Sequence, residues 1–295
     1  MEHQIAVSEG QAALRATLLF GQRHLGPAKW EPAPGSEAAG ELANAELRSQ
    51  GGPWGEDPPR TAYAAANLMM TAVLDNLSSI HQVLGSQMPV IGPTVLARSA
   101  IEIASGVWWL MEPGIGARRR VCRELALSLE SARRARQVGE EFQATGFQIS
   151  QEISDALQQE GRVMQRITDL GITPPSSAGY SPAVENEKAK SATDATTDMF
   201  RAALPKSVPG TSVYRTYSAV MHGEIYGLMN FMAPGVTSDG SAILHWHLPP
   251  EVLDSTIQLA ILAFRESYQR INKVMGWGKL EGDLWEAKLQ KIYNS

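Results

Sequence analysis

The sequence has little cysteine and no long apolar run, and both absences narrow what the chain can be. Its single cysteine, Cys122, can neither form a disulfide within the chain nor supply a cysteine-rich zinc site. No stretch approaches the roughly 18 consecutive apolar residues that indicate a membrane span. Arg15 and Arg23 interrupt the apolar segment near the N-terminus, which argues against a secretory signal. We therefore expect a cytoplasmic protein that does not act on membranes.

The sequence also lacks the local motifs of common cofactor sites. No glycine-rich phosphate loop, dinucleotide fingerprint or HExxH zinc motif is present, so no cofactor is predicted. The 26 Lys and Arg are outnumbered by 31 Asp and Glu, and the net charge of -5 argues against a general nucleic-acid binder. What is present is an ordinary globular composition, 43% hydrophobic and 19% charged over 295 residues.

Apolar residues at helical spacing dominate the chain after residue 59. Before it we expect one helix, with Ser8 as its N-cap and its end near His24, and then a segment rich in Pro and Gly that cannot continue a helix. We therefore predict an all-α fold, a multi-helix bundle of about eight or nine helices, in two parts, residues 1–59 and residues 60–295.

Prolines, glycines and polar loops separate the predicted helices of the second part. These cover residues 60–84, 94–112, 116–145, 147–170, 195–204, 210–231 and 250–275, with a short helix up to residue 293. The helix over 94–112 is apolar nearly all round, so we place it at the centre of the bundle. Residues 171–190 are predicted as a loop. Only residues 236–248 alternate as strands do, around an Asp-Gly turn, which predicts one small β-ribbon.

The central helix carries the first candidate site residues. Arg98 and Glu102 stand one helical turn apart and can pair on one face. Such a pair can be a structural ion pair that fixes the helix. Alternatively, Glu102 orients the planar guanidinium of Arg98 toward an anionic ligand. Both roles stay open at this point, and the site hypothesis uses the second, with Trp109 of the same helix contributing to the site.

The helix predicted over 210–231 is expected to be buried and yet carries several polar residues. At 100° per residue, Arg215 and His222 lie about 20° apart, with Ser218 and Tyr226 on the same side. A histidine can act as acid or base near neutral pH, although on a core helix it can also be a hydrogen-bonded packing residue. The predicted catalytic residues are His222, Glu102 and Ser218. The predicted ligand-binding residues are Arg98, Arg215, Tyr214, His81, Trp109 and Tyr226.

His245 and His247 form another constellation, because alternate residues of a strand face the same way and both imidazoles could bind one metal ion. A third ligand would be needed, from His222, Glu224 or His81. Two histidines without a carboxylate partner are more typical of surface or packing positions, so no metal is predicted.

Arginines are frequent in the helix predicted over 116–145. They fall on several faces with glutamates between them, a pattern more typical of a solvated, salt-bridged helix than of a phosphate-binding stripe.

Two blocks of the sequence resemble a known group of proteins. Residues 97–124 contain Arg-Ser-x-x-Glu and Trp-x-Leu-x-x-Pro, and residues 214–223 contain Tyr-x-x-x-Ser-x-x-x-His-Gly. Together they resemble a group of actinobacterial helical proteins of unknown function, over about residues 60–275. The resemblance implies a helical fold and no established activity. It also implies that five residues share one site: Arg98, Glu102, Tyr214, Ser218 and His222.

Arg215 and His222 also match the Arg-x6-His spacing of HEPN ribonucleases. In that family the arginine holds the scissile phosphate and the histidine assists attack by the 2′-hydroxyl. Thr216 stands where the family commonly has Asn, Asp or His. About one such Arg–His pair arises by chance in a chain of this composition.

Three functional hypotheses follow. The leading one is a helical bundle whose polar inter-helix pocket binds a small or anionic ligand, with His222 as acid or base if the pocket is catalytic. The first alternative is a HEPN-like, metal-independent ribonuclease of the toxin or defence type, acting on RNA as a homodimer. The second is a non-enzymatic interaction protein in which the polar residues only specify packing.

Overall fold

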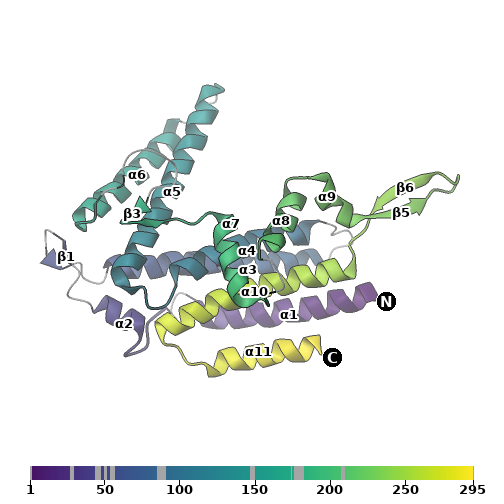
Figure 1. Ribbon diagram of the computed structural model, residues 1–295, viewed down its shortest axis with the longest axis horizontal. Helices are drawn as coiled ribbons and strands as arrows, with labels where there is room; N and C mark the ends of the chain where they lie inside the picture. Colours follow the sequence, from purple (N-terminus) through teal and green to yellow (C-terminus); the bar gives the residue numbers. More distant parts are fainter. Residues whose placement is uncertain are drawn as a thin grey trace. The chain divides into compact units, whose positions relative to one another are not determined.

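The structure is a computed structural model that describes residues 2–26, 30–43, 48–49, 52–53, 57–84, 91–146, 150–173, 175, 183–206 and 210–294. It confirms the predicted all-α fold with a small β-ribbon (Figure 1). The helices are α1 (Glu2–His24), α2 (Glu37–Leu42), α3 (Asp57–Leu84), α4 (Gly92–Leu110), α5 (Gly116–Ala144), α6 (Ser150–Asp169), α7 (Ala192–Ala203), α8 (Gly210–Met221), α9 (Ile225–Leu228), α10 (Pro250–Met275) and α11 (Leu280–Tyr293), with a 3-10 turn η2 (Met229–Phe231).

The strands of the described residues form three short antiparallel pairs. They are β1 (Arg48–Ser49) with β2 (Gly52–Pro53), β3 (Ala183–Val184) with β4 (Glu187–Lys188), and β5 (Met232–Val236) with β6 (Ala242–Trp246). The β5–β6 pair is the ribbon predicted over 236–248, shifted toward the N-terminus because strand pairing continues back to Met232, which lies opposite Trp246.

Several element boundaries differ from those predicted. Ser8 lies inside α1 rather than at its N-cap. The helix α3 begins at Asp57, because Pro58 and Pro59 occupy its first turn, where proline is tolerated. The short helix α2 lies within the Pro- and Gly-rich segment, capped by the Ser36 hydroxyl. The predicted loop 171–190 contains the β3–β4 hairpin, whose turn residues both have positive φ.

The prediction of one helix over residues 210–231 is wrong. α8 ends at Met221, and Gly223 then adopts a left-handed conformation with φ of 68°. The short helix α9 folds back onto α8, so that a Cβ on Gly227 would lie 2.7 Å from the carbonyl carbon of Ala219. The two glycines permit the reversal, which hydrophobic periodicity alone does not reveal.

The chain divides into two compact units, whereas the sequence predicted a single boundary near residue 59. Unit 1 comprises Met1–Glu31, Ala66–Met111 and Ser191–Ser295, and unit 2 comprises Pro32–Ala65 and Glu112–Lys190. None of the helices within the described ranges is long and apolar enough to cross a membrane.

The helix α4 is the centre of unit 1, as predicted, and packs against α10, α7 and α8. Fully buried Ala100 and Ala104 leave room for close contact between helices. Two hydrogen bonds show that α4 and α10 run in the same direction. The Ser267 hydroxyl donates to the Ala104 carbonyl (2.7 Å), and Arg270, further along α10, donates to the Trp108 carbonyl further along α4 (2.6 Å). α1 packs on α10 and α11, and the ring of Phe20 on α1 contacts those of Tyr268 on α10 and Trp285 on α11.

Unit 2 is built on the α5–α6 pair, with the β3–β4 hairpin against α5. Buried aliphatic residues of both helices form its core, among them Val121, Leu125 and Ile167. The arginines of α5 are salt-bridged as predicted, but several are not solvated. Those whose side chains are no more than 5% exposed are Arg120, Arg123 and Arg133.

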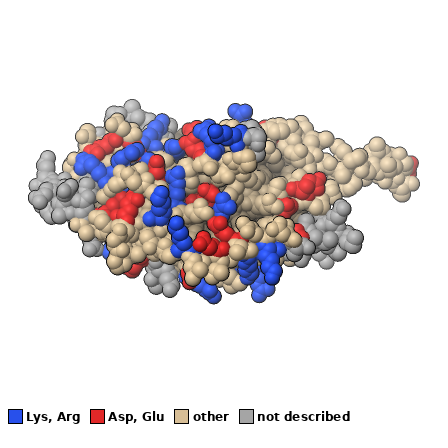
Figure 2. Space-filling view, turned by 60° about the horizontal axis from the view of Figure 1, so that its bottom comes forward, with Lys and Arg blue, Asp and Glu red and all other residues tan. Residues whose placement is uncertain are grey.

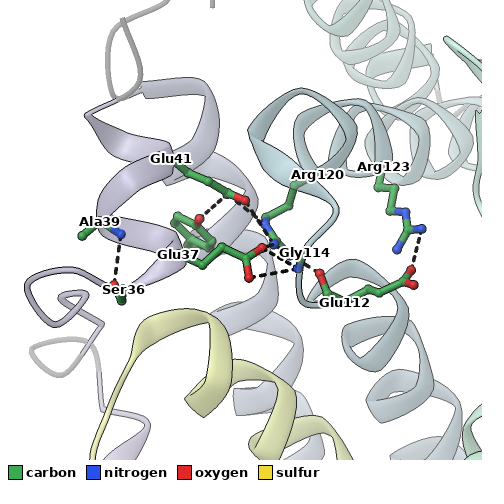
Figure 3. A network of polar contacts seen from close by, with 9 residues as sticks. Ser36, Glu37, Ala39, Glu41, Glu112, Gly114, Arg120 and Arg123 are labelled. Carbon is green, nitrogen blue, oxygen red and sulfur yellow. Dashed lines mark hydrogen bonds and ion pairs between the residues drawn. The ribbon is translucent and has the colours of Figure 1, made fainter. Parts of the chain in front are cut away.

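Arg120 has the most enclosed of these guanidinium groups. Its side chain is fully buried and pairs with Glu37 (2.7 Å) and Glu41 (3.0 Å) of α2 (Figure 3). The Tyr63 hydroxyl of α3 donates to the same Glu41 carboxylate, and burial together with that carboxylate raises the tyrosine pKa. Arg123 pairs in turn with Glu112 (2.7 Å). The ion pairs of Arg120 tie α2 to α5, and the hydrogen bond from Tyr63 joins α3 to the same network within unit 2.

Candidate functional site

Arg98 joins α4 to α8 and is the most enclosed charged group among the predicted site residues. Its side chain is 8% exposed. Nε donates to the Glu102 carboxylate at 2.7 Å, and Nη2 donates to the Tyr214 hydroxyl at 3.0 Å. Nη1 has the thioether sulfur of Met221 as its partner. The guanidinium carbon also lies 5.2 Å from the centre of the Tyr214 ring.

Helical periodicity explains this arrangement. Glu102 follows Arg98 by one turn of α4, so the two side chains lie on one face. Tyr214 and Met221 are seven residues, or two turns, apart on α8, and therefore both face α4. The side chain of Glu102 is 27% exposed, so it is in contact with water while its carboxylate pairs with Arg98.

The structure thus brings together three of the predicted residues, Arg98, Glu102 and Tyr214. Ser218 lies on the same face of α8, between Tyr214 and Met221, and is half-buried. Its side chain makes no hydrogen bond within the described part of the chain. Sequence reasoning missed Met221, although its spacing of seven residues from Tyr214 is a signal that would have placed it on this face.

Arg215 and His222 lie on the outer side of α8, exposed to solvent. Neither side chain forms a hydrogen bond or ion pair with any described residue. The prediction that the polar residues of this helix are buried is therefore wrong for these two. The buried residues of α8 include Tyr217, Ala219 and Val220, and Tyr214 contacts Arg98 of α4, whereas Arg215 and His222 are left at the surface.

The remaining predicted ligand-binding residues lie apart from the guanidinium of Arg98. Trp109 is buried in α4, and Tyr226 on α9 is 59% exposed. His81, near the end of α3, is half-buried, and its Nδ1 has no hydrogen-bond partner among the residues described. Arg98 makes no hydrogen bond, ion pair or ring contact with any of these three.

A cavity of about 360 Å³ lies within unit 1 between α4, α8 and α10. Apolar side chains form much of its wall, and its polar groups are neutral: Thr94, Ser212, Thr216, Tyr217, Asn230 and Ser255. The Thr94 hydroxyl is buried and has no hydrogen-bond partner in the described residues. An inter-helix pocket therefore borders α8, but it is lined by hydroxyl and amide groups rather than by Arg98, Glu102 and His222.

His245 on β6 and His247 just after it are both exposed. In the ranges that the structure describes, no group of three or more His, Cys, Asp or Glu side chains is placed to hold a metal ion. The third ligand that the two histidines would need is therefore not beside them there.

Comparisons with protein-family models, with curated proteins and with solved structures find no match for this chain.

Proposed function

We propose that the α4–α8 contact of unit 1 binds a small anionic ligand through Arg98. The proposal rests on the hydrogen bonding of one amino group of Arg98. The partner of this group, Nη1, is the sulfur of Met221. A thioether is a weak hydrogen-bond acceptor. A carboxylate or phosphate oxygen would form a shorter, charge-assisted bond with the same group.

The side chain of Met221 can move away from Arg98 to admit such a ligand. Its side chain is 52% exposed, so it can turn into solvent without leaving a cavity in the core. The ligand would then meet Nη1 and Nη2 as a planar fork, while Glu102 continues to hold Nε. Ser218 on the same face offers a hydroxyl beside the incoming anion.

The charge balance of the site limits the ligand. Arg98 is already paired with one carboxylate, that of Glu102, so the pair carries no net charge. A ligand with a single anionic group suits this site better than a polyphosphate, which Glu102 would repel. His222 lies one turn beyond Ser218 and would supply an acid or base only to a ligand that extends along the outer side of α8.

Calorimetric titration with acetate and with inorganic phosphate tests the proposal. We expect Arg98→Gln to abolish binding of both anions, and Met221→Ala to strengthen binding severalfold because it uncovers Nη1. The control is Arg201→Gln, which removes an arginine of α7 that is 70% exposed and ion-paired. The proposal is wrong if Arg98→Gln, shown to be folded by circular dichroism, binds the anions as the wild type does.

Cleavage of RNA is a second candidate, favoured by the exposure of Arg215 and His222 at neighbouring positions around α8. Exposed groups can reach a macromolecular substrate, which a buried pair cannot. The test is cleavage of a labelled single-stranded RNA in EDTA by the wild type and by Arg215→Ala and His222→Ala. Equal cleavage by all three proteins would exclude this candidate.

A further inference from the structure

The part of unit 1 formed by α9, η2 and the β5–β6 hairpin exposes a concentration of large apolar side chains. We call it the hairpin surface, and its exposed apolar residues are Ile225, Tyr226, Met229, Val236, Ile243, Leu244 and Trp246. Ile225 is 80% exposed and Val236 is 72% exposed. Concentrations of large exposed apolar side chains are uncommon on the surfaces of monomers and often mark interaction sites.

The hairpin extends away from the helices of its unit (Figure 1). All five residues of β6 are exposed, and among the described residues β6 pairs with β5 alone. Its other edge therefore presents unpaired backbone N–H and C=O groups. β5 is the less suitable edge for pairing, because Pro234 lacks a donor.

The hairpin surface also lacks the charges that usually protect a sheet edge. Between Ile225 and Trp246 the only Asp, Glu, Lys or Arg is Asp239, in the turn. Figure 2 shows the projecting hairpin almost free of acidic and basic side chains, in contrast to the mixed charges elsewhere on that face. Natural proteins commonly place lysine, proline or a bulge on an exposed edge to prevent pairing. β6 contains neither lysine nor proline, and its register with β5 is continuous.

The apolar area that the hairpin surface exposes is close in size to one side of a standard protein interface. At roughly 150–200 Å² for each large side chain and a little over half of it exposed, seven residues present on the order of 700 Å². A standard protein interface buries about 800 Å² on each partner.

We propose that a second copy of this chain covers the hairpin surface, with β6 of one protomer antiparallel to β6 of its partner. Antiparallel pairing of two identical strands obeys a two-fold axis, so one patch serves both protomers. The two hairpins would form a continuous four-stranded sheet, and side chains of β6 such as Leu244 and Trp246 would contact those of the partner strand across the paired edge. A neutral surface offers little to attract a strongly charged partner, which favours self-association. The dimer does not depend on anion binding at Arg98.

The first test is the molar mass in solution, measured by light scattering and by sedimentation over a range of concentrations. We expect the wild type to be a dimer and Leu244→Lys to be a monomer, because the lysine puts two like charges at the paired edge. Leu280→Lys is the matched control, since Leu280 on α11 is 71% exposed and lies outside the hairpin surface. It should remain a dimer.

The second test locates the interface. The sole native cysteine, Cys122, is buried, so a short bismaleimide crosslinker should join protomers of Leu244→Cys and leave those of Leu280→Cys unlinked. A wild type that stays monomeric at high concentration overturns the proposal. So does a dimer that Leu244→Lys leaves intact, or one in which Leu244→Cys does not crosslink.

Discussion

Arg119 and Arg120 are neighbours on α5, and each pairs with glutamate, but their surroundings differ. The Arg119 side chain is 56% exposed and pairs with Glu187, whereas that of Arg120 is fully buried between Glu37 and Glu41. Removing one partner of a buried ion pair leaves an uncompensated charge, which costs about 3–5 kcal/mol. An exposed pair contributes at most about 1 kcal/mol.

We therefore predict that Arg120→Ala lowers the free energy of unfolding by about 3–5 kcal/mol and that Arg119→Ala lowers it by less than about 1 kcal/mol. Urea unfolding followed by circular dichroism measures both. Similar losses in the two variants would show that the buried network is not what holds α2 to α5.

Glu185 makes the stability of unit 2 depend on pH. Hydrogen bonding from Arg118 holds the pKa of the Glu185 carboxyl below its usual value, although partial burial acts in the opposite direction. Because the folded state then takes up the proton at lower pH than the unfolded state does, the pair stabilises the fold above the ordinary carboxyl pKa. That contribution is lost as the pH falls through the lowered value.

The prediction is that wild type and Glu185→Gln differ in unfolding free energy at neutral pH and converge as the pH falls below the ordinary carboxyl pKa. Urea titrations at successive pH values measure the difference. Arg118→Gln removes the same pair and should follow the same profile, and a difference that stays constant down to the lowest pH would contradict the assignment.

At the scale of elements, the reversal between α8 and α9 depends on Gly227. A Cβ at this position would lie 2.7 Å from the backbone of both Ala219 and Val220, and backbone atoms cannot move aside as a side chain end can. We predict that Gly227→Ala lowers the free energy of unfolding by about 1–3 kcal/mol through this overpacking.

Gly282 of α11 provides the matched control in the same unit. A Cβ there would make an ordinary contact of 3.6 Å with the Tyr268 ring, and its φ is not in the left-handed region. Alanine is the better helix former, so Gly282→Ala should stabilise the protein by up to about 1 kcal/mol. Thermal unfolding of the two variants should shift in opposite directions, and a neutral Gly227→Ala would mean that α9 is not held closely against α8.

On the scale of the whole molecule, the sequence predicted what local spacing determines. Helices were found because apolar residues recur every three or four positions, and the Arg98–Glu102 pair was found because its partners are one turn apart. The partners of Arg120 are 79 and 83 residues away, and no local pattern points to them.

The candidate site shows the same limit. The residue pattern of α8 identified a face with Tyr214 and Ser218, and the structure places Tyr214 against Arg98. The neighbouring face carries Arg215 and His222. Its exposure to solvent depends on where the chain turns after Met221. That turn is set by tertiary packing around glycines, so the exposure of His222 could not be predicted from periodicity.

The division into two units can be tested with the single cysteine. Cys122 lies in the core of unit 2, and burial raises the pKa of its thiol to about 12, so the folded protein should resist thiol reagents. Most tryptophans lie in unit 1, among them Trp108, Trp109 and Trp285, so fluorescence chiefly reports that unit.

We predict that Cys122 becomes reactive at a lower urea concentration than the midpoint of the fluorescence transition. Unit 2 contains fewer residues, and a smaller unit buries a smaller fraction of its surface on folding. Much of its internal polar contact is also between charged groups, whose pairing offsets the cost of desolvation only in part. If labelling and fluorescence instead change together, the helix α3, which begins in unit 2 and continues into unit 1, couples the two into one cooperative structure.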